Sequence, residues 1–184
     1  MTYYGAKDLA AAFRTVRGNT IQIAEEIPEN KYDFRPAGES RTVGQTLTHI
    51  AFSSGIQHHI QGTKVTDLKN VNFPELHGKA VAEESKPRTK AEIIALLKSE
   101  GESFAAFLEG LSESFLAERV AMPQGAEPPA KSRFEMLLAP KEHEMHHRAQ
   151  LMTIQRMIGL VPHLTRRMQE RMAAAMAGQG QRAH

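Results

Sequence analysis

The sequence predicts an all-α protein, a four-helix bundle followed by a short C-terminal helical tail. In four long segments apolar residues recur at spacings of three and four, as they do in amphipathic helices. Stretches that contain Pro and Gly separate these segments. The chain has 184 residues, which suits one domain, and four long helices of this kind pack as a bundle. We therefore assign residues 1–164 to the bundle and residues 165–184 to a basic tail.

The first two helices are expected before residue 62. An apolar stripe runs from Leu9 to Ile27, where Pro28 ends the helix. A second helix is expected from about Thr42 to Gln61. Its apolar residues lie on two faces, which indicates a helix packed in the middle of the bundle.

The next segment, residues 62–88, is expected to be a long loop because it is polar and interrupted by Gly and Pro. Thr89 and Glu92 then form a capping box that begins the third helix, which ends near Leu111. The fourth helix covers about residues 132–159, and Pro140 either kinks it or marks where it begins. We find no segment that predicts a strand.

The composition excludes several classes of protein. Cysteine is absent, which rules out a disulfide scaffold, a thiolate nucleophile and any Cys-ligated metal site. No run of about 18 apolar residues predicts a transmembrane helix, and the N-terminus lacks the pattern of a signal peptide. We therefore expect a cytoplasmic protein with no membrane partner.

The charge is nearly balanced, with 23 basic and 21 acidic residues and a net charge of +2. The basic excess is confined to the tail, where four arginines accompany one glutamate. Four arginines are a small footprint for nucleic acid, so a solvated terminal helix is the favoured interpretation and nucleic acid is not an expected partner.

Histidines are concentrated in the fourth helix, where three fall within residues 143–147. His143 and His147 lie one turn apart, about 40° from each other around the helix axis, on the face that Leu151 continues. Buried imidazoles need partners, and a divalent metal satisfies two of them together. A third ligand is required, and His49 in the second helix is the best candidate; the alternative for each is a hydrogen-bonded core histidine.

The same residues also spell H-E-x-x-H, in which Glu144 would be the general base of a zinc protease. The metzincin extension of that motif requires Gly and His where Gln150 and Thr153 stand. The one acidic residue after Glu144 is Glu170, in the tail. A metalloprotease is therefore the less favoured alternative.

The sequence resembles the DinB superfamily, which includes the YfiT-like metal-dependent hydrolases. The resemblance covers about residues 6–165, with matching pieces at 42–51 (TVGQTLTHIA), 143–151 (HEMHHRAQL), 32–36 (YDFRP) and 159–162 (GLVP). It implies a four-helix bundle of the DinB/YfiT type with a three-histidine metal site. The implied ligands map onto His49, His143 and His147, the trio that helical periodicity also indicates. Ala149 stands where a common family form has Gly, a change that leaves the ligands intact.

The resemblance implies a divalent metal, zinc or nickel, a small-molecule substrate and a homodimer. Some relatives are thiol transferases that act with bacillithiol, mycothiol or glutathione, so a low-molecular-weight thiol is a candidate cofactor. The metal would lower the pKa of a thiol for S-transfer or of a water for hydrolysis. The alternative is a non-catalytic metal-binding bundle that acts as an interaction protein, with Met168, Met172 and Met176 as contacts.

Three further residues receive candidate roles at this site. Glu144 or another pocket residue would carry a proton. Gln45 lies one turn before His49 and would orient a ligand or substrate, unless it is a helix-surface amide. Arg148 would bind an anionic group, unless it is solvated or faces a second subunit.

Overall fold

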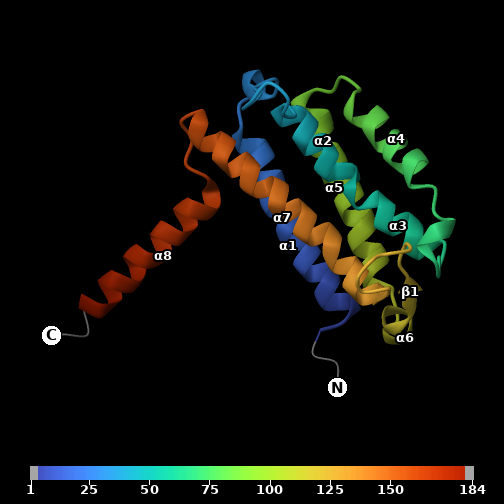
Figure 1. Cartoon of the computed structure of the whole chain (residues 1–184). Helices are drawn as coiled ribbons and strands as arrows, with labels where there is room; N and C mark the ends of the chain where they lie inside the picture. The colour runs from blue at the N-terminus through green and yellow to red at the C-terminus, as the bar shows by residue number, and fades with distance from the viewer. Residues whose placement is uncertain (1–3, 181–184) are drawn as a thin grey trace.

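Four helical columns lie side by side in the computed structural model, which describes residues 4–180 (Figure 1). They are α1 (Ala6–Glu26), α2 (Val43–Ser53) continued by α3 (Gly55–Gly62), α5 (Lys90–Glu109) and α7 (Arg133–Met157). α1 packs against α5 and α7, and α2 packs against the same two helices. This arrangement confirms the predicted four-helix bundle.

Capping boxes begin three of the core helices. The side chains of Thr42, Thr89 and Ser132 accept from the backbone of Gln45, Glu92 and Glu135, whose side chains bond back. The apolar residues of the predicted stripes form the core of the bundle. The core cluster around α2 and α7 includes Ile23, Ile27, Val43, Leu47, Ile50, Leu97 and Leu151.

The expected second helix is broken at Ser54 into α2 and α3. The amide of Ser54 bonds to the carbonyl of Phe52, and the Ile50 carbonyl instead accepts from Arg17 Nη2 at 3.1 Å and Ser53 Oγ at 2.9 Å. Side chains that take a backbone acceptor from the helical ladder bend a helix. The prediction of one continuous helix was therefore wrong.

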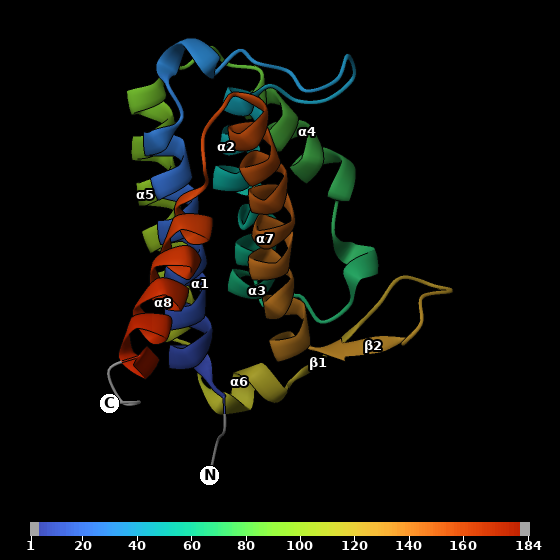
Figure 2. The same ribbon diagram turned by 90° about the vertical axis from the view of Figure 1, so that its left-hand side faces the viewer.

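The segment 62–88 is not simply a loop, as we expected. It contains a 3₁₀ turn, Leu68–Asn70, and the helix α4 (Phe73–Glu84), which stands outside the bundle beside α2 (Figures 1 and 2). Asn72 caps α4 by accepting from the amide of Glu75, and Pro74 lies in its first turn. None of the residues of α4, all described, is buried.

A small hairpin is a second departure from the prediction of no strands. β1 (Arg119–Ala121) pairs antiparallel with β2 (Ala130–Ser132), with Arg119 opposite Ser132. The Pro-rich segment between them forms the hairpin loop and holds a cis peptide at Pro128. The short helix α6 (Glu113–Ala117) leads into β1, and a 3₁₀ turn, Glu29–Lys31, follows α1.

α7 is one helix with Pro140 inside it, and Gly159 at φ +85° follows its end. α8 (His163–Gly180) then contacts α1 and diverges from the bundle (Figure 1). Its attachment includes an ion pair of 2.6 Å between Arg166 and Glu26 and a hydrogen bond of 2.9 Å from Arg167 to Gln22. The exposed side chains of α8 include Met168, Met172 and Met176, at 58%, 55% and 72%.

Within residues 4–180, no helix is both long and apolar enough to cross a membrane. His184 and Arg182, which belong to the predicted basic tail, lie outside the described residues.

Candidate metal centre

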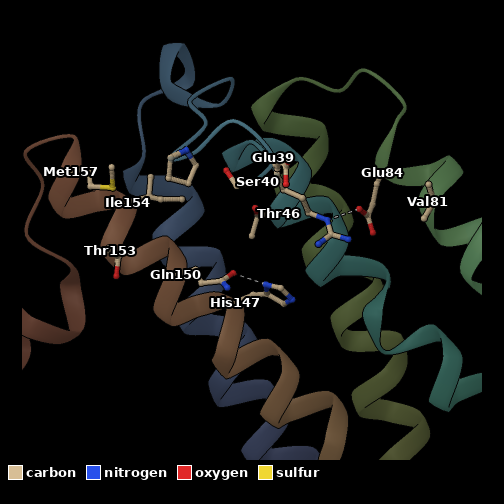
Figure 3. A pocket seen from close by; sticks show the side chains of 12 residues that line it. Glu39, Ser40, Thr46, Val81, Glu84, His147, Gln150, Thr153, Ile154 and Met157 are labelled. Carbon is tan, nitrogen blue, oxygen red and sulfur yellow. Dashed lines mark hydrogen bonds and ion pairs between the residues drawn. The ribbon is translucent and has the colours of Figure 1, made fainter.

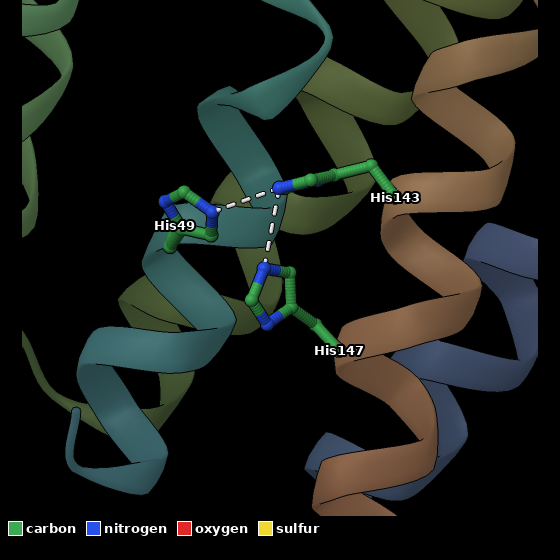
Figure 4. A group of neighbouring side chains, drawn as sticks. All are labelled: His49, His143 and His147. Carbon is green, nitrogen blue, oxygen red and sulfur yellow. Dashed lines mark hydrogen bonds between the residues drawn. The ribbon is translucent and has the colours of Figure 1, made fainter. Parts of the chain in front are cut away.

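Three imidazole rings converge on one point between α2 and α7 (Figure 4). His143 Nε2 lies 3.2 Å from His49 Nε2 and 3.2 Å from His147 Nε2. The three histidines form a group whose ligand atoms all lie within 4.8 Å of one another. The structure thus brings together the three residues that were predicted as ligands.

Hydrogen bonds on the far side of two rings fix which nitrogen faces this point. His49 Nδ1 lies 2.5 Å from Glu84 Oε1, and His147 Nδ1 lies 2.8 Å from Gln150 Oε1. Both oxygens accept, so both rings donate from Nδ1 and present a bare Nε2. Outer partners of this kind orient metal-ligating histidines.

The third ring is less well satisfied. His143 Nδ1 is buried and has no hydrogen-bond partner among the described residues. Its Nε2 faces two lone pairs, and one proton there cannot bond well to both. A cation at the common point would satisfy all three nitrogens.

Burial and mutual repulsion favour the neutral form of two of these rings, His143 and His147. Burial, together with His147, His49 and His146, lowers the pKa of His143 to about 4. The pKa of His147 is also lowered, chiefly by burial and against the bond to Gln150. Metal ligation requires neutral imidazole, so this electrostatic environment suits a metal.

The spacing of the nitrogens also fits a metal. Nitrogens bound at 2.0–2.1 Å around a tetrahedral zinc lie about 3.3 Å from one another, close to the 3.2 Å observed for two of the pairs. Three protein nitrogens leave a position open for a small molecule, as in catalytic rather than structural zinc sites. The residues present therefore fit a divalent metal.

Two adjoining cavities open beside the histidines. The larger, about 720 Å³, reaches His147 and Gln150 on α7 and Val81 and Glu84 on α4 (Figure 3). The smaller, about 290 Å³, reaches His49 and His143. Arg41, Val81 and Glu84 line both, so the cluster lies at the junction of two spaces that a small molecule could enter.

Glu144 does not lie at this site, although it follows His143 directly. Its side chain is 0% exposed and paired with Arg17, whose Nε lies 3.0 Å and 3.1 Å from the two carboxylate oxygens. A carboxylate held in that way on another face of α7 is not placed to carry a proton at the cluster. The protease alternative, which needs this glutamate beside the metal, loses its basis for the same reason.

The other two candidate residues, Gln45 and Arg148, also lie away from the histidine cluster. The Gln45 side chain accepts from the Thr42 amide at 3.0 Å, so it caps α2. Arg148 is half-buried near Glu144, and burial lowers its pKa while the Glu144 carboxylate opposes that effect. Neither residue lines the two cavities beside the histidines, as far as the structure describes the chain.

Three residues that sequence reasoning missed take part instead. Glu84 and Gln150 hold the histidine rings, and Arg41 Nε donates to Glu84 Oε2 at 2.7 Å. Gln150 lies three residues after His147 on one helix, a spacing that the sequence already offered. Glu84 is 35 residues from His49 and gave no such signal.

The chain is similar in sequence and fold to several known proteins. The uncharacterized protein YjoA of Bacillus subtilis (strain 168) is 24% identical over 154 residues, 84% of this chain and 91% of YjoA. YfiT of Bacillus subtilis, described as a probable metal-dependent hydrolase with an unusual four-helix bundle topology, superposes with a TM-score of 0.68 at 18% identity. That match covers 87% of this chain and 91% of YfiT.

A mycothiol-dependent maleylpyruvate isomerase superposes with a TM-score of 0.62 at 13% identity, over 82% of this chain and 63% of the isomerase. At such identities, the solved structures show a shared fold. The sequence profile of the DinB superfamily matches residues 12–151, well over half of the chain. The chain therefore belongs to the DinB superfamily.

Proposed function

We propose that His49, His143 and His147 bind one divalent metal ion, zinc or nickel, and that the protein is a metal-dependent enzyme for a small molecule. The observation that carries this proposal is the convergence of three imidazole nitrogens at the junction of two cavities. Such a site keeps a coordination position for a reactant. The reaction we propose is thiol S-transfer or hydrolysis.

A bound metal would supply a Lewis acid that lowers the pKa of a thiol or a water at neutral pH. The chain's own residues do the rest. Glu84 and Gln150 orient two of the rings, and Val81, Ile154 and Met157 give the larger cavity apolar walls. Such walls limit the access of water to a reactive group.

Arg41 takes the place that we first gave to Arg148 as the candidate for binding an anionic group. Its side chain is 42% exposed, lines both cavities and is held through Nε by Glu84. A guanidinium carries further donors at Nη1 and Nη2, in a planar arrangement that matches a carboxylate. The proposed substrate or thiol therefore carries a carboxylate.

The size of the larger cavity and the fold relatives support both reaction types. About 720 Å³ lies within the range of small-molecule sites and leaves room for a thiol beside a second reactant. YfiT is described as a probable metal-dependent hydrolase and the isomerase as mycothiol-dependent, and each shares this fold. The prediction of a homodimer stays a prediction.

Turnover assays on metal-loaded protein test the proposal. Tag-free protein is stripped with a chelator and reloaded with zinc or nickel. It is then assayed with bacillithiol, mycothiol or glutathione against electrophiles and, separately, with ester and amide substrates. His143→Ala is the inactive control and His146→Ala the matched one, because the His146 ring bonds to Gln150 instead of facing the common point.

We expect metal-dependent turnover in the parent and in His146→Ala, and none in His143→Ala. Stoichiometric metal without turnover in any assay would contradict the enzymatic part of the proposal. It would favour the non-catalytic metal-binding protein.

A further inference from the structure

We propose that α4 is a docked arm whose Glu84 positions the metal ligand His49, so that metal binding and docking of α4 are coupled. The coupling rests on the proposed metal function, whereas the positioning of the His49 ring does not. Glu84 is a positioning residue in this proposal, because it acts through His49.

α4 is held on the bundle by few interactions. None of its residues is buried, and it packs mainly on α2 (Figure 1). One face nevertheless lines the smaller cavity, through His77, Ala80, Val81 and Glu84, which are spaced as residues on one side of a helix. The exposed helix therefore forms a wall of the space beside the histidines.

Glu84 is the residue through which α4 reaches the cluster. Its side chain is 11% exposed, although acidic residues on an outlying helix usually point to water. One carboxylate oxygen lies 2.5 Å from His49 Nδ1 and the other 2.7 Å from Arg41 Nε. The carboxylate thus joins α4 to α2 and to the segment before α2 at a single point.

This contact decides which nitrogen of His49 is available. A neutral imidazole in water carries its proton mainly on Nε2, where it would block ligation from that atom. The Glu84 carboxylate accepts a hydrogen bond from Nδ1–H, which keeps the proton on Nδ1 and leaves the Nε2 lone pair facing His143. Glu84 holds His49 in the tautomer that the cluster needs.

The coupling between metal binding and α4 docking follows from the reciprocity of linked equilibria. If docked α4 raises the affinity of the site for metal, bound metal must stabilise docked α4 by the same factor. A helix with no buried residue opens readily, so its amides should report this change. Metal loading should slow hydrogen exchange across Phe73–Glu84.

Glu84→Ala tests the proposal, with Glu83→Ala as the matched control. Both remove one carboxylate from the last turn of α4 and insert a good helix former. Glu83 pairs with Lys86 and Arg88, so its loss loosens the same end of the helix without touching His49. Three readouts are needed on the full chain: zinc affinity by competition with a chromophoric chelator, hydrogen exchange of α4 with and without zinc, and the His49 tautomer by nitrogen-15 NMR of zinc-free protein.

We expect zinc to bind about 10- to 100-fold more weakly to Glu84→Ala than to the parent, as for other outer-partner variants. The His49 proton should move from Nδ1 towards Nε2, and zinc should no longer protect α4. Glu83→Ala should keep the parent's tautomer and zinc-dependent protection, and it should lose far less zinc affinity than Glu84→Ala.

Other outcomes overturn the proposal in distinguishable ways. Parent-like affinity and tautomer in Glu84→Ala would refute the positioning role while the metal function stands. An equal loss in Glu83→Ala would show that helix docking matters and the carboxylate itself does not. A parent that binds neither zinc nor nickel would refute the proposed function and the coupling together, and the tautomer measurement would still decide the role of Glu84.

Discussion

The buried pair of Arg17 and Glu144 gives a prediction that separates a structural glutamate from a catalytic one. Arg17 is 4% and Glu144 0% exposed, and Arg17 also donates to the carbonyls of Leu97 at 2.9 Å and Ile50 at 3.1 Å. One guanidinium therefore bonds to α2, α5 and α7 from its place on α1. Glu144→Gln keeps the shape of the side chain and removes the charge that neutralises this guanidinium.

Removing one partner of a buried ion pair costs about 3–5 kcal/mol, because the other charge stays buried without compensation. The glutamine oxygen can still accept one bond from Arg17, so we expect the lower end, about 3 kcal/mol. With a urea dependence of about 2 kcal/mol per M, the midpoint should fall by about 1.5 M. Affinity for metal at pH 7 should be retained in the folded variant.

Urea unfolding followed by circular dichroism in chelator-containing buffer measures this change. Glu142→Gln is the matched control, since Glu142 is exposed on the same helix and its loss should stay within about 0.5 kcal/mol. A parent-like midpoint for Glu144→Gln, together with lost metal-dependent turnover, would refute the reasoning. It would return Glu144 to the role of general base.

Three further predictions concern the bundle, the metal and α8. Gly101→Ala should destabilise the protein by about 1–3 kcal/mol in the same urea assay, because a Cβ there would lie 2.7 Å from Arg17 Cγ. Stability equal to that of the parent would show instead that the Arg17 side chain can shift. Zinc at 100 times its dissociation constant should stabilise the fold by about 2.7 kcal/mol and raise the melting temperature by about 5–10 °C. A chelator should reverse the rise, and an equal rise in His143→Ala would place the zinc elsewhere. Burial disfavours the charge of Glu26, but bonds from Arg166 and Gln22 outweigh it and lower the pKa of that carboxyl. The Glu26–Arg166 contact therefore holds above the ordinary pKa of about 4.5 and is lost as pH falls through the lowered value. The protection of the α8 amides, corrected for the intrinsic exchange rate at each pH, should fall over that range, and constant protection would contradict the attachment.

The ligand trio and the bundle were predictable because both follow from helical periodicity. The apolar stripe of α1 that ends at Ile27 lies in the core, and so does Leu151 on α7. His143 and His147 lie on the same face of α7 as Leu151. α4 was missed for the opposite reason. Its apolar residues, which include Phe73, Leu76, Ala80 and Val81, are few and none is buried, and Pro74 and Gly78 within the segment indicated a loop.

Two of the candidate residues, Gln45 and Glu144, lie in other surroundings than expected, for reasons that differ in kind. The Thr42–Gln45 box has the same spacing as the Thr89–Glu92 box that we recognised, so the capping role of Gln45 was available from sequence. The partner of Glu144 lies on α1, 127 residues away, and no local pattern announces it. The contact of Glu84 with His49 depends in the same way on the placement of α4.

Metal analysis of the purified chain tests the central claim most directly. Tag-free parent, His147→Ala and His146→Ala are loaded with zinc, desalted and analysed for metal per chain. We expect about one zinc per chain in the parent and in His146→Ala, and a large loss in His147→Ala, because only His147 of that pair lies in the cluster. Equal zinc in all three proteins, or none in the parent, would contradict the three-histidine centre.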